Sequence, residues 1–282
     1  MISLLSHTGA ASSAGGNITT TPISTLTASV IFAYAVAEGA QNPVFSDSLG
    51  NVWKALTTQS APGHEQGVLY YCVAPITGAS HTFILSASNV SYPALCVAAF
   101  TGLTTSAFLD AQNGAVTAST VSTFQPGSVT PAVNGELLIA GLGFNGGAPP
   151  ITVSIDSGFA ITDQFYLANS YGCALAYLVQ AVAAPVDPTW TVAASGTIET
   201  PVASLGALDP ISLANARVAQ SSLDVITLSN PHAQVFQSCL DIITIPAVVG
   251  VQIILRGVKR LQSGPSETLQ DIQGAAHVKR AV

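Results

Sequence analysis

Short runs rich in Val, Ile, Thr, Phe and Tyr follow one another along most of the chain, and Gly, Pro, Asn and Ser separate them. Helical periodicity is nearly absent before residue 260, and the turn signals recur roughly every 8–15 residues, as in sandwiches and barrels. The sequence therefore predicts an all-β fold, with a jelly-roll-like antiparallel β-sandwich over residues 1–206. Strands are expected at 25–37, 52–58, 67–74, 80–87, 94–102, 136–144, 150–155, 158–164, 172–181, 188–194 and 198–206.

Several of these runs are apolar on both faces, which indicates central strands covered by a second layer or by a neighbouring subunit. The Thr/Ser-rich residues 111–134 are more typical of edge strands and loops. Residues 46–51 place the Asx acceptor Asp47 before a glycine, a composition that suits a hairpin connection.

Charged residues make up only 7% of the chain, against roughly 25% in an average soluble protein. Ser, Thr, Asn, Gln and Gly must supply most of the polar surface, so charge repulsion protects it poorly against association. Such a surface suits a coat, a fibre or a multimer. The alternative is a secreted β domain that is merely rich in Ser and Thr.

The charges are also unevenly distributed. Residues 1–210 hold ten acids and a single base, Lys54, whereas residues 211–282 hold four acids and six bases. This shift predicts two regions with different surroundings. The basic cluster is small and lacks aromatic residues, so we expect no nucleic-acid binding.

The N-terminal start has no positive n-region, and no run of 18 apolar residues occurs, so we expect neither a signal peptide nor a membrane span. The chain is expected to be made in the cytoplasm and used there, or released by a route such as host lysis.

An internal repeat begins after residue 207. Residues 217–228 and 234–245 match at most positions, with a period of 17 residues, and each copy is long enough for one extended strand. We interpret residues 207–260 as a small strand-repeat segment for assembly, which the apolar run 248–255 continues. The polar residues 261–282 predict a tail that either contains a short helix at most or is mobile.

Signatures of catalysis are missing from the sequence. It contains no Gly-x-Ser-x-Gly elbow, and its five histidines stand in loop-like or terminal surroundings. A glycan-cleaving enzyme would need two facing carboxylates, for which Glu136 and Asp156 are the pair to test. The alternative is that each is a solvated strand-end or turn residue. Loop acids such as Asp47 could bind calcium, but no Asp-x-Asp-x-Asp run gathers ligands. We therefore predict a non-enzyme without a cofactor and assign no metal ligands; whether a calcium ion is bound stays open. The other loop acids considered for calcium are Asp110 and Asp163.

Cysteines and aromatic residues suggest packing more than chemistry. The four cysteines are far apart without a Cys-x-x-Cys pair, so we interpret them as small buried hydrophobes; whether any pair as disulfides stays open. Trp53 and Trp190 lie in strand-like phrases and are expected in the core. Tyr166 and Tyr171, which flank residues 167–170, are the candidates for an exposed glycan-binding platform.

A series of short phrases, in order along residues 1–206, resembles a β-sandwich domain of uncharacterised bacterial and bacteriophage proteins, often tail or surface proteins. The doubled Arg-Val-x-Gln-x-x-Leu-Asp-Val segment resembles the tandem strand motifs of phage minor tail or fibre proteins, although Ile-Thr replaces their usual Val-Leu pair. The phrases are Phe45–Trp53, Leu69–Ala74, His81–Phe83, Val97–Gly102, Phe108–Asp110, Asn134–Leu138, Ser157–Ile161, Ala176–Val179 and Thr189–Thr191.

The resemblance implies a virion structural protein of tail, fibre, collar or capsid decoration, with no catalytic residues. It would act by assembly and host contact. Its partners would be other virion proteins, further copies of itself (a trimer among the options) and a host surface glycan. Arg217, Arg256, Lys259 and Arg260 would pair with an acidic neighbour. The alternatives are a carbohydrate-binding module and, after it, a glycan-cleaving enzyme.

Overall fold

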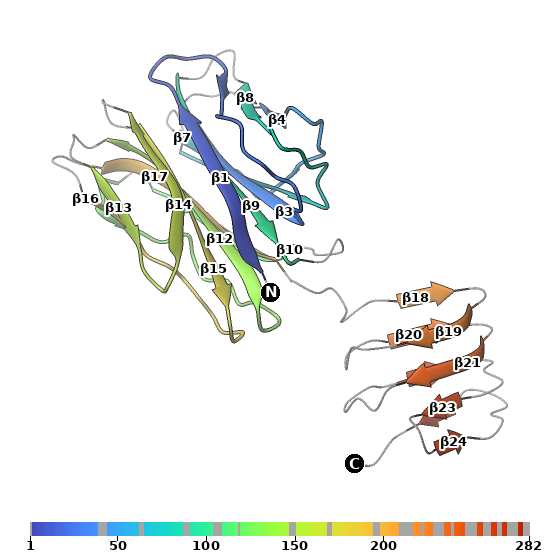
Figure 1. Ribbon diagram of the computed structural model, residues 1–282. Coiled ribbons are helices and arrows are strands. Elements are labelled where there is room, and N and C mark those ends of the chain that lie inside the picture. The colour runs from blue at the N-terminus through green and yellow to red at the C-terminus, as the bar shows by residue number, and fades with distance from the viewer. Residues whose placement is uncertain are drawn as a thin grey trace. The chain divides into compact units, whose positions relative to one another are not determined.

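The computed structural model divides the chain into two compact units, Met1–Pro210 and Ile211–Val282 (Figure 1). Within the described residues all regular structure is β-strand, which confirms the predicted all-β class. The described residues are 2–38, 44–61, 65–86, 91–103, 109–117, 119–146, 151–167, 171–193, 198–208, 217–220, 223–227, 234–237, 240–245, 253–255, 261–263, 267–269 and 276–278.

Two large antiparallel sheets form the middle of the first unit. The first has the order β1 (Ser3–Ala11), β9 (Ser91–Thr101), β3 (Val30–Glu38), β7 (Glu65–Val73) and β5 (Lys54–Ala55), with β6 (Gln59–Ser60) also paired to β7. The second has the order β10 (Leu109–Val116), β17 (Ile198–Leu208), β12 (Glu136–Gly146), β15 (Tyr171–Gln180) and β14 (Ala160–Leu167).

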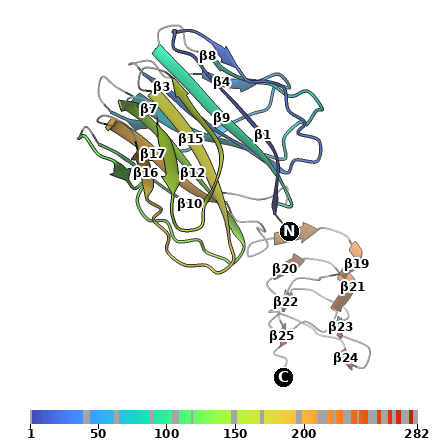
Figure 2. The same ribbon diagram turned by 60° about the vertical axis from the view of Figure 1, so that its left-hand side comes forward.

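Two small antiparallel sheets complete a four-layer stack. Figures 1 and 2 show them on opposite outer sides of the large sheets. One consists of β2 (Ile18–Thr19), β8 (Phe83–Ser86) and β4 (Val44–Asp47), and the other of β11 (Thr123–Phe124), β16 (Trp190–Ala193) and β13 (Thr152–Ile155).

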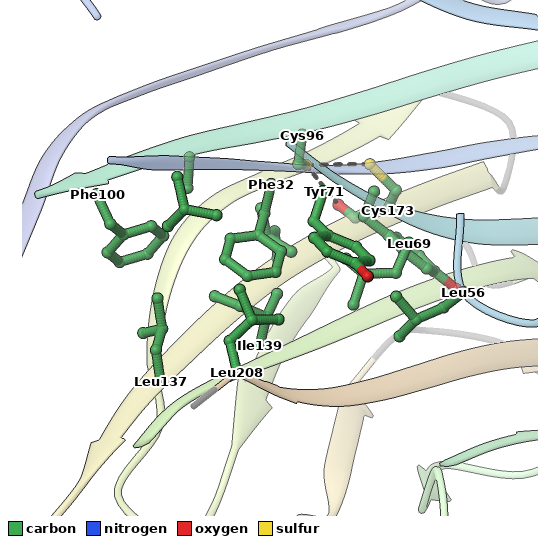
Figure 3. Close-up of a cluster of buried hydrophobic side chains, with 14 of the residues drawn as sticks. Phe32, Leu56, Leu69, Tyr71, Cys96, Phe100, Leu137, Ile139, Cys173 and Leu208 are labelled. Atoms are coloured by element: carbon green, nitrogen blue, oxygen red, sulfur yellow. Dashed lines mark hydrogen bonds between the residues drawn. The ribbon is translucent and has the colours of Figure 1, made fainter. Parts of the chain in front are cut away.

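Both faces of each large sheet are therefore covered. Alternate residues of β3, such as Phe32, face the central core between the large sheets, where Ile139 of β12 packs (Figure 3). The intervening residues, such as Ile31, pack against Phe83 of the small outer sheet. Burial on both faces explains why residues 30–37 form an unbroken apolar run without polar alternation.

The same fold occurs twice within the first unit. In each half the first strand pairs with the last, and the second strand pairs with the last but one, as in a jelly roll. Strands β1, β2, β3, β4, β5, β7, β8 and β9 correspond in order to β10, β11, β12, β13, β14, β15, β16 and β17. The prediction of a jelly-roll-like sandwich is confirmed, but residues 1–206 hold two sandwiches instead of one.

Strand register supports this correspondence residue by residue. Phe32 pairs with Tyr71 in the first sandwich, and Ile139 pairs with Tyr177 at the equivalent place in the second. By the same register Tyr34 corresponds to Gly141, and Val36 to Gly143.

Equivalent positions also meet where the two sandwiches pack together. A Cβ built on Gly141 would overlap the ring of Tyr34, and one built on Gly143 would lie 2.8 Å from both methyl carbons of Val36. The Tyr34 hydroxyl donates a hydrogen bond to the Val202 carbonyl of β17, at 3.1 Å. Large side chains in the first half thus fit over glycines in the second, which allows close approach of the sheets.

Most predicted strands are present, within a few residues at their ends. Trp190 is fully buried as expected, and β10 lies at a sheet edge within the region predicted to hold edge strands. Strand β1 was not predicted, because an edge strand that is only half-buried has no continuous apolar run. Strand β17 continues to Leu208, where it pairs with Leu137, so the first unit extends a few residues past the predicted boundary at residue 206. The hairpin expected at residues 46–51 is also wrong, because β4 and β5 belong to different sheets.

The second unit contains a parallel stack of repeats. Strand β18 (Arg217–Gln220) pairs in parallel with β20 (Gln234–Gln237), and β19 (Leu223–Thr227) pairs in parallel with β21 (Leu240–Ile245). Identical repeat positions lie side by side, so that Val218 faces Val235. The prediction of one extended strand per copy is wrong, because the two strands of each copy belong to different sheets. Stacking of identical units is typical of solenoids.

Residues 253–278 continue this unit with further short strands. Strand β23 (Leu261–Ser263) extends the sheet of β21 in parallel, and β24 (Glu267–Leu269) then reverses direction. Strand β22 (Ile253–Leu255) pairs antiparallel with β25 (Ala276–Val278). The predicted polar tail therefore contributes strands in its described part, where a short helix at most was expected.

The contact between Tyr34 and Gly141 predicts strong energetic coupling. Gly141→Ala should lower the free energy of unfolding by about 1–3 kcal/mol, because the added methyl group overpacks the contact with the ring. In a Tyr34→Ala background the same change should cost much less. Urea denaturation of the two single variants and the double variant measures this coupling, and additive effects would contradict it.

Candidate functional site

A buried polar network lies at the end of β4 in the first sandwich. The side chains of Asp47 and His81 are both fully buried, and His81 Nε2 lies 3.1 Å from Asp47 Oδ1. The other imidazole nitrogen, Nδ1, lies 3.0 Å from the Thr25 hydroxyl. His81 also stacks on Phe83, with 4.3 Å between ring centroids. Buried charged groups require partners of this kind, because burial without them is costly.

Asp47 accepts several hydrogen bonds. Its Oδ2 accepts the indole N–H of Trp53 at 2.6 Å, and its Oδ1 accepts the backbone N–H of Leu49 at 2.7 Å. The Leu49 bond makes residues 47–49 the Asx turn that the sequence suggested. Burial raises the pKa of the Asp47 carboxyl, but the hydrogen bonds from Trp53, Leu49, His81 and Asn51 outweigh it and hold this pKa below its ordinary value.

The network fastens three loops to one another. The Gly78 N–H donates to the Thr25 hydroxyl at 3.1 Å, which joins residues 74–80 to residues 24–29. Asn51 joins the loop 48–53 to residues 74–80, because its side chain accepts the N–H of Ile76 at 2.6 Å and donates to the Ile76 carbonyl at 3.1 Å. These hydrogen bonds between groups of the protein itself hold the three loops in fixed positions relative to one another.

These fastened loops expose apolar side chains. Val52 is 85% exposed, Ile76 is 59% exposed and Leu26 is 50% exposed, and each is a fastened residue or its immediate neighbour. Lys54, the single base of residues 1–210, follows in the same segment and lies over the Tyr71 ring. We name Leu26, Val52 and Ile76 the apolar loop end. Exposed apolar side chains on fixed loops are suited to contact with another molecule.

The second sandwich serves as an internal comparison. At the positions equivalent to Asp47 and His81 it has Ile155 and Pro188, so the buried pair is absent there. By contrast, both halves have a hydrogen bond from a backbone N–H to the side-chain oxygen of the residue that follows β4 or β13. Ser48 Oγ accepts the N–H of Thr82 at 3.1 Å in the first half, and in the second Asp156 Oδ1 accepts the N–H of Thr189 at 2.7 Å. The fold itself therefore does not require the Asp47–His81 pair.

The order Thr25–His81–Asp47 has the form of a nucleophile, base and orienting acid. The Thr25 side chain is nevertheless fully buried and already accepts the Gly78 N–H. No substrate carbonyl could reach this hydroxyl in the present arrangement. Its contribution is to hold the loops.

Glu136 and Asp156, the carboxylates considered for glycan cleavage, differ in their surroundings. Glu136 is fully buried, and its Oε1 accepts the N–H of Val133 at 2.9 Å. Asp156 is exposed at a turn and accepts the Ser157 hydroxyl as well as the Thr189 N–H. Both therefore stabilise turns. The alternative interpretation, a solvated strand-end or turn residue, holds for Asp156 but is wrong for Glu136, which is buried.

The predicted aromatic platform is described only in part. Tyr171 stacks on Tyr92, with ring centroids 3.9 Å apart and an interplanar angle of 7°. The side chain of Tyr166 lies outside the described residues, although its backbone pairs with Gly172. No local sequence pattern indicates Tyr92, because the two tyrosines meet only when β9 and β15 face each other.

Two of the histidines have acidic partners in the structure. His7 lies within β1, and its Nδ1 is 3.0 Å from Asp163 Oδ2 on β14. Burial raises the pKa of Asp163, and His7 offsets part of this effect. His81 is the fully buried partner of Asp47 described above.

The loop acids considered for calcium have protein partners, since Asp110 accepts the Ala132 N–H at 2.9 Å and Asp47 and Asp163 contact histidines. No group of three metal-ligating side chains occurs among the described residues. That part of the chain also contains no helix long and apolar enough to cross a bilayer.

Of the four basic residues expected to mediate assembly, one lies within the described residues. Arg217 begins β18, where its backbone pairs with Gln234. Arg256, Lys259 and Arg260 lie outside the described residues.

No protein-family model, curated protein or solved structure matches this chain.

The Asp47 network predicts pH-dependent stability. Because the folded pKa of Asp47 is lower than the unfolded one, its ionised carboxylate stabilises the fold above about pH 4, and this contribution is lost as pH falls through the folded pKa. Asp47→Asn should lower the free energy of unfolding by about 2 kcal/mol at pH 6, since buried donors lose their acceptor. The deficit should shrink toward pH 2.

Urea denaturation between pH 6 and pH 2 measures this effect. The matched control is Asp156→Asn in the second sandwich, where the carboxylate is exposed and a smaller effect is expected. A deficit for Asp47→Asn that does not change with pH would contradict the assignment.

Proposed function

We propose that the chain is a bacteriophage virion structural protein that acts through assembly and surface contact. The observation that carries this proposal is the apolar loop end, where Leu26, Val52 and Ile76 stand exposed on loops fastened by a buried network. The duplicated sandwich does not need that network, as the second half demonstrates. Fixed loops with apolar tips lose little conformational entropy on binding, which favours a contact surface.

Composition supports the same proposal. A surface with 7% charged residues is suited to being covered by neighbours, and the excess of acids in residues 1–210 contrasts with the excess of bases beyond them. Within the second unit, repeats stack through parallel strand pairing, a mode of association that further copies can extend. Arg217, Arg256, Lys259 and Arg260 would pair there with an acidic neighbour.

In this proposal the partners are other virion proteins and further copies of the chain, for which a trimer is one form. The location would be the tail, a fibre, the collar or a capsid decoration. The protein would be made in the host cytoplasm and released by lysis. It would need neither a cofactor nor catalysis.

Substitutions at the apolar loop end test the proposal. Val52→Ser combined with Ile76→Ser should reduce incorporation into particles at least tenfold, because the contact loses apolar area, while the thermal midpoint stays within about 2 °C. Mass spectrometry of purified particles measures incorporation. Val44→Ser is the matched control, because Val44 is 64% exposed but lies at the opposite end of β4. A chain absent from every particle and monomeric in solution would overturn the proposal.

A carbohydrate-binding module is the second candidate, supported by the stacked Tyr92 and Tyr171 rings. Aromatic faces are common sugar-binding surfaces, and each of these rings is partly exposed. Tyr171→Ala should then weaken binding to host polysaccharides at least tenfold on a glycan array. Tyr177→Ala, which removes a tyrosine packed against the central core, is the control for general disruption. Absence of binding by the unmodified chain would exclude this candidate.

A further inference from the structure

Two cysteines from different sandwiches meet in the central core. Cys96 lies on β9 and Cys173 on β15, and their sulfur atoms are 3.1 Å apart, as the dashed line in Figure 3 marks. Both side chains are fully buried, and 77 residues separate them in the sequence. Both are free thiols in this structure. Cys72, by contrast, has no such thiol partner among the described residues.

Duplication explains why this space holds two sulfur atoms. By strand register Cys173 corresponds to Gly67, and Cys96 corresponds to Ser204. Beside Gly67 the room is filled by Tyr34, whose hydroxyl a Cβ on that glycine would overlap. The residue equivalent to Tyr34 is Gly141, which has no side chain to reach the thiols. The two cysteines therefore occupy a space that an aromatic side chain fills in the other half.

We propose that Cys96 and Cys173 form a disulfide that links the two sandwiches covalently. The oxidant is a second disulfide, which is oxidised glutathione in the steps written below and a disulfide-bearing oxidase in the bacterial periplasm. A disulfide requires about 2.05 Å between sulfur atoms, so side-chain rotation has to close about 1 Å. This inference does not rest on the proposed virion role: it concerns a chain that folds under oxidising conditions, and a chain that folds in the cytoplasm keeps both thiols.

The chemistry is two successive thiol–disulfide exchanges. The Cys96 thiol loses its proton, and its sulfur attacks one sulfur of oxidised glutathione and expels a glutathione thiolate. The Cys173 thiolate then attacks the Cys96 sulfur of this mixed disulfide and expels the second glutathione. The protein loses two protons and two electrons in total, and the oxidant is reduced to two glutathione thiols.

Burial determines when this reaction proceeds. It raises the pKa of the Cys96 thiol well above its ordinary value, so this residue contains little reactive thiolate in the folded protein. Glutathione also cannot reach the sulfur atom of Cys96 or Cys173 in the folded protein, because neither side chain is exposed. The disulfide should therefore form while the chain folds in an oxidising compartment, and reductants should attack it slowly afterwards.

The test expresses the full chain in a bacterial periplasm and, in parallel, in the cytoplasm. Trypsin cannot separate the two cysteines, because no Lys or Arg lies between Lys54 and Arg217. Cleavage before aspartate in a Cys72→Ala background does separate them, into peptides 47–109 and 163–186. Alkylation after unfolding, followed by mass spectrometry, then shows whether these two peptides are linked.

The expected result is a linked pair in the periplasmic protein that disappears on reduction and in Cys96→Ala and Cys173→Ala. The oxidised protein should melt about 10 °C higher than the reduced one, because the link closes a long loop of the unfolded chain. Both cysteines alkylated separately in the periplasmic protein, or a link to Cys239 in their place, would overturn the proposal. So would equal melting temperatures of the linked and the reduced protein.

Discussion

The close packing of two large sheets against each other underlies the rest of this structure. It depends on glycines in β12 opposite large side chains in β3, above all Gly141 under the ring of Tyr34. Because this contact covers one face of each large sheet and a small outer sheet covers the other, strands such as β3 are apolar throughout. A dense core of this kind tolerates little change in side-chain volume. Both the contact of Cys96 with Cys173 and the Tyr34 hydrogen bond arise from the same close approach.

Comparison of the two sandwiches distinguishes features that the fold requires, which occur in both, from features that occur in one of them. The turn hydrogen bond of Ser48 recurs at Asp156, and the strand order recurs completely, so these features belong to the fold. The buried pair of Asp47 and His81 occurs in one half alone of the described first unit. It fastens loops whose exposed tips are apolar. Burying an ionisable pair costs desolvation free energy, so such a pair is expected where precise positioning of loops is useful.

The two units of the chain combine different building principles. The first buries apolar residues between non-local antiparallel strands, whereas the second stacks short repeats in parallel with like residues side by side. Repeats bury a continuous core only when neighbours stack, and their terminal strands leave pairing edges. Together with the scarcity of charge, this combination supports assembly as the property to investigate first.

The sequence by itself determined the class of fold, the place of most strands and the burial of Trp190, because apolar patterning and turn residues act locally. It also determined the repeat, since identical residues recur at a short period. Only the tertiary structure decided that the first unit is duplicated, that Asp47 meets His81, that Tyr171 meets Tyr92 and that Cys96 meets Cys173. These pairs come together through the pairing and facing of sheets across long stretches of chain, which no local pattern encodes.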